Sequence, residues 1–162
     1  MKKTALFLAT GVFTGFSPVA PGTAGSLLAA CILYFVPEFS SLSFLVITVL
    51  IIIVGIWASA EAERHFNKTD ASQIVIDEIA GMFISVAFVP YSPQNIIIAF
   101  FLFRLFDIIK PPPARQAEDA GTVLLKPGTP LHRFSGGVGI MLDDVVAGIY
   151  ANIALHLLLA LR

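Results

Sequence analysis

The chain has 162 residues, of which 57% are hydrophobic and only 13% are charged, and its mean hydropathy is +0.87. A soluble domain carries about 25% charged residues, so this composition indicates that lipid surrounds much of the protein. The net charge of −1 offers no support for nucleic-acid binding, and the single cysteine excludes a disulfide framework or a cysteine metal site within one chain.

The N-terminal segment combines Lys2 and Lys3 with an apolar stretch over residues 5–16. This arrangement imitates a secretory signal, but the apolar part is nearer to half a bilayer than to a whole one. A loop rich in glycine and proline follows it and leads into another apolar run. We therefore expect a short interfacial or re-entrant helix at this end of the chain.

Apolar runs close to membrane-spanning length make up most of the remaining sequence. Residues 42–60 are uncharged, and roughly 20 such residues cross the hydrocarbon layer as a helix. The uncharged block 79–103 is interrupted by the turn signal Pro90-Tyr91-Ser92-Pro93, which divides it between two helices. The sequence therefore predicts an all-α integral membrane helical bundle, a single domain over residues 1–162. We expect four to five membrane helices, at residues 23–36, 42–60, 74–89, 94–109 and 137–161.

Basic residues indicate how such a bundle is oriented. If the N-terminus is cytoplasmic, the expected spans bring nine of the ten Lys and Arg residues to or near one side. Cytoplasmic loops of membrane proteins carry an excess of Lys and Arg, so we expect this side to face the cytoplasm. The nine residues are Lys2, Lys3, Arg64, Lys68, Arg104, Lys110, Arg115, Lys126 and Arg133.

Acidic side chains lie at the ends of the apolar runs, although the chain has only eleven of them in all. The expected topology brings five of these carboxylates to the same cytoplasmic depth. Such a set would repel itself unless a cation lay among it, and hard oxygen ligands favour Mg²⁺ over zinc. We therefore predict that the same five residues are both metal ligands and catalytic residues: Asp77, Glu78, Asp107, Asp143 and Asp144.

Cationic residues and a glycine-rich loop beside the acids would suit a phosphate. Arg104 lies one helical turn before Asp107, and Lys110 lies three residues after it, directly before three prolines that must end the helix. A structural ion pair is the alternative for this trio. The loop before the first span could present amides and hydroxyls to an anion at a positive helix end. Lys110 is also a candidate catalytic residue, and the candidate substrate-binding residues are Arg104, Lys110, Gly22, Thr23, Gly25, Ser26 and Arg115.

Four sequence blocks together resemble the signature blocks of the phosphatidylglycerophosphatase A family. The resemblance implies a bacterial inner-membrane, multi-pass, Mg²⁺-dependent lipid phosphatase that converts phosphatidylglycerophosphate to phosphatidylglycerol and phosphate on the cytoplasmic side. The family's acidic positions fall on the five carboxylates, and its basic positions fall on Arg104 and Lys110. The blocks span residues 15–150 and read Ser17-Pro18…Pro21-Gly22-Thr23…Gly25-Ser26, Ile76-Asp77-Glu78-Ile79…Gly81-Met82, Phe103-Arg104…Phe106-Asp107…Lys110-Pro111-Pro112-Pro113 and Gly136-Gly137-Val138-Gly139-Ile140-Met141…Asp143-Asp144…Ala147-Gly148.

Two other functions fit parts of the pattern. Another metal-dependent membrane phosphotransferase, of the CDP-alcohol type, also gathers carboxylates around Mg²⁺, but its Asp-Gly-x2-Ala-Arg run is not found in this sequence. A small cation transporter would also contain intramembrane acids, but nearer to the middle of the membrane. For the phosphatase itself, direct attack by water and an aspartyl-phosphate intermediate both remain open.

Overall fold

The computed structural model describes residues 2–35 and 41–161, and the regular elements in these ranges are all helical. This confirms the predicted all-α fold. The α-helices are α1 (Lys2–Ala9), α2 (Pro21–Phe35), α3 (Ser41–Phe66), α4 (Ile76–Ser85), α5 (Pro93–Ile109), α6 (Ala114–Glu118), α7 (Ala120–Leu124) and α8 (Ser135–Ala160). Two short 3-10 turns, η1 (Thr14–Phe16) and η2 (Pro130–Phe134), complete the set.

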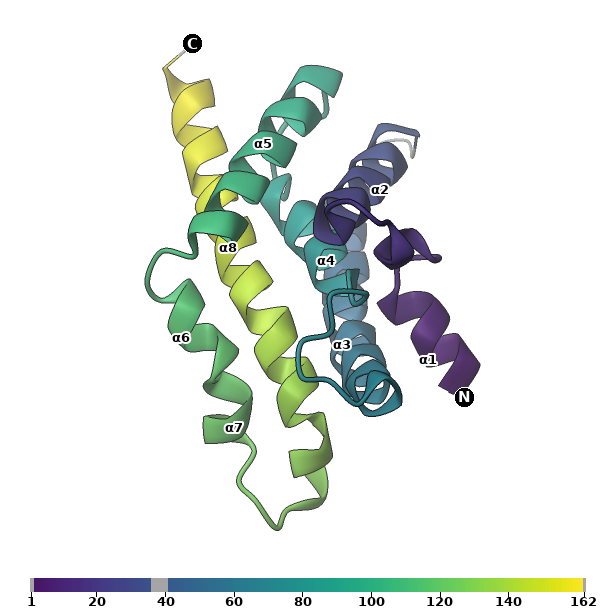
Figure 1. The fold of residues 1–162 in the computed structure, drawn as a ribbon. Helices are drawn as coiled ribbons and strands as arrows, with labels where there is room; N and C mark the ends of the chain where they lie inside the picture. The colour runs from purple at the N-terminus through teal and green to yellow at the C-terminus, as the bar shows by residue number, and fades with distance from the viewer. Residues whose placement is uncertain (1, 36–40, 162) are drawn as a thin grey trace.

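Helix α8 is the centre of the bundle, and it contacts α3, α4, α5, α6 and α7 (Figure 1). Helix α4 lies between α8 and α2, while α1 packs against α3. The C-terminal end of α3 and the α6, α7 and η2 segment lie at the end of the bundle where the N-terminus is found, and the C-terminus lies at the opposite end. The elements that carry many of the Lys and Arg residues therefore lie at the same end of the bundle.

Two glycines let α4 and α8 approach closely. A Cβ atom added to Gly148 would lie only 2.6 Å from the carbonyl oxygen of Gly81, and one added to Gly81 would collide with the ring of Phe103 on α5. No larger residue fits at either position without moving a helix, because Cβ contacts of this kind are not tolerated in packed interiors. The three helices that bear the five candidate carboxylates are thus held together around these two glycines.

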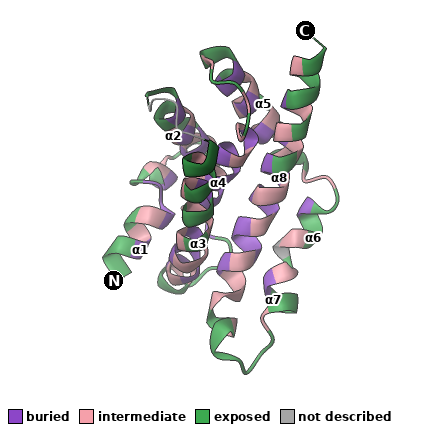
Figure 2. Cartoon of the chain, turned by 180° about the vertical axis from the view of Figure 1, so that it is seen from behind, coloured by how far each residue is buried: buried purple, intermediate pink, exposed green. Residues whose placement is uncertain are grey.

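Two helices are long and apolar enough to cross a membrane: α3, and α8 together with the η2 turn before it. Only 17% of the most apolar 18-residue stretch of α3 is buried, whereas the core helix of a soluble protein is mostly buried. Figure 2 shows the exposed residues along α3, which include Leu45, Val49 and Ile53. This exposed apolar surface indicates membrane association.

The other expected spans correspond to shorter helices. Helix α2 has 15 residues, α4 has 10 and α5 has 17, compared with the roughly 20 needed to cross the hydrocarbon layer. The described residues therefore show two helices of spanning length rather than the four to five that were expected. Val36, the expected end of the first span, and the loop that follows it lie outside the described residues.

The N-terminal helix, α1, ends at Ala9 and covers only the first part of the apolar stretch over residues 5–16. A local glycine cap closes it: Gly11 has positive φ, and the Val12 amide donates to the Phe7 carbonyl at 3.0 Å. The Ala9 carbonyl accepts a hydrogen bond from the amide of Val75 at 2.8 Å. This bond ties the end of α1 to the start of α4.

The end of α4 also differs from the expected one, because of a contact with α8. Helix α4 stops at Ser85 instead of residue 89, and the side chain of Asn152 donates to the carbonyls of Ser85 (3.2 Å) and Ala87 (2.9 Å). These bonds satisfy carbonyls that the helix end leaves without partners.

Helix α8 begins at Ser135. Asp143 and Asp144 therefore lie about two turns after its first residue, whereas we expected them at the start of the last span.

Candidate active site

Two buried carboxylates, Asp77 and Asp144, and the largely buried carboxylate of Glu78 form the centre of the site. Each of Asp77, Glu78 and Asp144 offers one oxygen, and these oxygens all lie within 4.8 Å of one another. Asp77 and Glu78 occupy the first turn of α4, and Asp144 comes from the middle of α8. The close packing of α4 on α8 therefore creates the cluster from residues 66 positions apart in sequence, counting from Glu78 to Asp144.

The donor set fits a divalent cation. One carboxylate oxygen on each of the three residues is buried and has no hydrogen-bond partner among the described residues. Buried carboxylates without partners are costly, and a cation between them would remove this cost. Oxygen ligands alone also suit Mn²⁺ or Ca²⁺.

Asp107 borders this cluster and pairs with Arg104. The Arg104 Nη1 atom forms an ion pair with the Asp107 carboxylate one turn away on α5, and it lies 4.0 Å from Glu78 Oε1. The predicted approach of Asp107 to the other acids is thus seen in the structure, although it is not one of the three residues whose oxygens converge.

Asp143 faces a different partner from its neighbour Asp144. Its Oδ2 atom accepts a hydrogen bond from Lys110 Nζ at 2.6 Å, and its Oδ1 atom accepts from the Asp144 amide at 3.0 Å. Lys110 was expected to share a helix face with Arg104 and Asp107, but it caps α5 with positive φ and reaches α8 instead. The three prolines after it end the helix as predicted, and Tyr150 of α8 donates to the Pro112 carbonyl at 2.7 Å.

The glycine-rich segment near Gly22 lies in the first turns of α2 rather than in a loop, because α2 begins at Pro21. The amides of Gly22 and Thr23 are in the first turn, where a helix has no internal acceptors for them. A Cβ atom on Gly22 would collide with Glu78 Oε1 and would lie 3.2 Å from Arg104 Nη1. The positive end of α2 therefore lies directly beside the acidic cluster.

The other predicted substrate-binding residues differ in their position. Ser26 accepts a hydrogen bond from Arg104 Nη1 at 3.5 Å and donates to the Gly22 carbonyl at 2.9 Å, so it joins α2 to the site. Gly25 is needed for packing, since a Cβ atom there would lie 2.7 Å from the Cβ of Val75. Thr23 is half-buried in the first turn, while Arg115 is exposed on α6 and no contact in the described residues joins it to the acids.

Arg104 retains hydrogen-bonding capacity at the site. Its Nε atom is buried and has no hydrogen-bond partner among the described residues. A buried guanidinium donor without an acceptor is unfavourable, and a phosphate oxygen is the acceptor that the fork of Arg fits best. Together with the first-turn amides of α2, this donor makes the edge of the carboxylate cluster suitable for an anion.

Gly22→Ala tests this arrangement around Glu78. The added methyl group is expected to displace the Glu78 carboxylate and to lower the apparent Mg²⁺ affinity, and with it the Mg²⁺-dependent turnover predicted from the sequence, by about tenfold. In a helix, Gly→Ala is otherwise stabilising by about 0.5–1 kcal/mol, so any loss must come from the collision. Activity against Mg²⁺ concentration measures the effect, and thermal unfolding in the same detergent is the control. Unchanged Mg²⁺ dependence would show that Gly22 does not constrain Glu78.

Comparison with known proteins gives a consistent result. Residues 7–159 match the protein family described as phosphatidylglycerophosphatase A. Proteins named phosphatidylglycerophosphatase A from Haemophilus influenzae and Escherichia coli are 36% and 32% identical to this chain, covering 90% and 88% of it and 83% and 76% of their own lengths. A Bacteroides thetaiotaomicron protein with the provisional name phosphatidylinositol-3-phosphatase is 40% identical, over 91% of this chain and 89% of its own length. No solved structure matches the chain.

Proposed function

Because the chain belongs to the phosphatidylglycerophosphatase A family of lipid phosphatases, we propose that it dephosphorylates phosphatidylglycerophosphate to phosphatidylglycerol in a Mg²⁺-dependent reaction. The observation that supports this most directly is the buried triad of Asp77, Glu78 and Asp144, whose unpartnered oxygens lie beside Arg104. A divalent cation and a fixed positive side chain together stabilise the charge of a phosphoryl group in transfer, and this site offers places for both.

The triad would hold the cation, which when bound supplies Lewis-acid polarisation of the phosphoryl group and an activated water. Arg104 would bind phosphoryl oxygens through its unpartnered Nε donor and stabilise the charge that develops on them. Asp107 keeps the Arg104 guanidinium in position, while Lys110 is held at the rim by Asp143. In hydrolysis the bond between phosphorus and the glycerol oxygen breaks, the phosphoryl group passes to a water oxygen, and a proton goes to the glycerol oxygen.

We further propose that the whole chain acts as one domain in the cytoplasmic membrane of a bacterium, crosses it several times and has its site on the cytoplasmic side. The gathering of the N-terminus, the end of α3 and the α6, α7 and η2 segment at one end of the bundle supports this orientation, since their basic residues favour the cytoplasm. Family membership favours hydrolysis over the phosphotransferase and transporter alternatives.

Phosphate release by the purified protein in detergent tests the proposed function. We expect release from phosphatidylglycerophosphate with Mg²⁺ present, loss of at least about 99% of the rate in EDTA, and recovery when Mg²⁺ is added back, because the cation that the triad would hold supplies the Lewis acid and the activated water. Release that persists unchanged in EDTA would contradict a metal-dependent site.

Phosphatidylinositol 3-phosphate is the second candidate substrate, favoured by the provisional name of the Bacteroides thetaiotaomicron relative. Both lipids present a phosphomonoester on a polar headgroup, so the carboxylate triad does not distinguish them. The ratio of their kcat/KM values in the same mixed micelles decides between them. A higher kcat/KM for the inositol lipid would make phosphatidylinositol 3-phosphate the substrate. The reaction would still be the hydrolysis of a phosphomonoester.

A further inference from the structure

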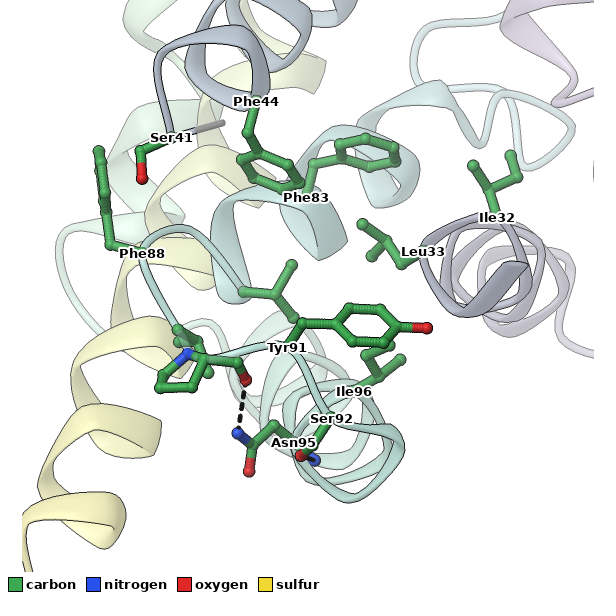
Figure 3. A pocket seen from close by; sticks show the side chains of 13 residues that line it. Ile32, Leu33, Ser41, Phe44, Phe83, Phe88, Tyr91, Ser92, Asn95 and Ile96 are labelled. Carbon is green, nitrogen blue, oxygen red and sulfur yellow. Dashed lines mark hydrogen bonds between the residues drawn. The ribbon is translucent and has the colours of Figure 1, made fainter. Parts of the chain in front are cut away.

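A second hollow lies away from the carboxylates, between α2, α4, α5 and the start of α3 (Figure 3). Its volume is about 340 Å³, and Leu33, Phe83, Ile96 and Phe44 form its apolar walls. Leu33, Phe83 and Ile96 are buried, whereas Ile32 and Phe88 are exposed, so the hollow reaches the surface at these two residues. Volumes of a few hundred cubic ångströms are typical of small-ligand sites.

Three polar side chains that line this hollow are bonded to the protein's own backbone. Asn95 Nδ2 donates to the Pro90 carbonyl at 2.8 Å, and the Tyr91 hydroxyl donates to the Tyr34 carbonyl at 2.6 Å. The Ser92 hydroxyl accepts from the Asn95 amide at 3.1 Å as the cap of α5. With these groups engaged, the apolar walls favour a hydrocarbon occupant.

The position of the hollow relates it to the phosphate site. The three helices that bring Ser26, Glu78 and Arg104 together also form its walls. Leu33 lies seven residues beyond Ser26 on α2, Phe83 five beyond Glu78 on α4, and Ile96 eight before Arg104 on α5. At 1.5 Å of rise per residue these separations are about 10.5, 7.5 and 12 Å. The hollow therefore begins about 10 Å along the bundle from the Arg104 region.

We propose that this hollow binds the distal part of an acyl chain of the lipid substrate. Half of a hydrocarbon core of about 30 Å is about 15 Å, the depth that an acyl chain reaches from its headgroup. A lipid whose phosphate lies at Arg104 has chains long enough to enter the hollow, and shorter chains would stop before it. This inference rests on the proposed function, because it takes the headgroup to lie at the carboxylate cluster.

Ser41→Trp, at the exposed edge of the hollow, tests the inference. Turnover is compared for dipalmitoyl and dioctanoyl phosphatidylglycerophosphate, both fully incorporated in mixed micelles at one surface fraction. The variant is expected to lower kcat/KM for the dipalmitoyl lipid by at least about tenfold, the effect of displacing a few methylenes from an apolar pocket, and to leave the dioctanoyl lipid within about twofold. Leu42→Trp is the matched control: it is the next residue on the same helix, is exposed and does not line the hollow, so both lipids should keep their rates.

Equal losses on the two lipids in Ser41→Trp, or equal effects of Ser41→Trp and Leu42→Trp, would overturn the acyl-chain site. If Ser41→Trp does not fold, the wild-type protein is labelled with phosphatidylglycerophosphate bearing a photoactivatable group at the acyl terminus. The site is supported if α2, α4 and α5 are labelled near the hollow and an excess of unlabelled dipalmitoyl substrate suppresses this labelling. If the unlabelled substrate does not suppress it, the label has reacted from the surrounding lipid and the site is refuted. Absence of Mg²⁺-dependent phosphate release by the wild type would instead refute the proposed function.

Discussion

Asp144→Asn is expected to lower kcat for phosphate release by about three orders of magnitude, because it removes one of three buried carboxylates that converge on a common point. Asparagine keeps the size of the side chain, so the packing of α8 on α4 should persist. The measurement is single-turnover phosphate release at saturating Mg²⁺. Asp119→Asn, an exposed residue between α6 and α7, provides the matched control and should retain full activity.

A second readout separates a ligand role from a structural role for Asp144. Without Mg²⁺ the variant should unfold at the same temperature as the wild type or at a higher one, because one of several mutually repelling carboxylates has lost its charge. Added Mg²⁺ should raise the unfolding temperature of the wild type, since a ligand that binds the folded state stabilises it, and should not raise that of the variant. A variant that is stabilised by Mg²⁺ as strongly as the wild type would exclude Asp144 as a ligand.

The sequence predicted the helical fold and the gathering of the acids because both depend on local patterns. Apolar run length indicated the helices, the Pro90–Pro93 turn separated α4 from α5, and the three prolines after Lys110 ended α5. Acidic residues placed at corresponding depths indicated a shared site, and the structure brings Asp77, Glu78 and Asp144 together. Their roles as ligands and catalysts stay predictions.

The remaining features depend on contacts between distant residues. The end of α4 at Ser85 depends on Asn152, 67 positions later, and the docking of α1 onto the start of α4 depends on the amide of Val75. The pairing of Lys110 with Asp143 instead of Asp107 follows from the positive φ at the end of α5, which points the chain toward α8. No periodicity or motif signals such contacts, because each arises only after the helices pack.

The apolar hollow beside Phe83 could not be found from sequence for a related reason. Leu33, Phe83 and Ile96 look like ordinary core residues in their helices, and only the early end of α4 leaves space between them. By contrast, the closeness of Gly22 to the acids had a sequence signal, since a glycine in the first turn of a helix allows close approach of another group. We expected this glycine in a loop before the first span, but α2 already begins at Pro21.

Arg104→Lys is expected to lower kcat/KM by about a hundredfold while leaving the Mg²⁺ affinity within about threefold. Lysine retains the positive charge beside Asp107, so the buried carboxylate keeps a partner and the fold should persist. It lacks the Nε donor and the planar fork, and these are the groups through which Arg104 would hold phosphoryl oxygens. Steady-state kinetics across Mg²⁺ and lipid concentrations separates the two effects, with Arg64→Lys at the exposed end of α3 as the control. A parallel fall in Mg²⁺ affinity and in kcat/KM would assign Arg104 to organising the carboxylates rather than to binding the phosphoryl group.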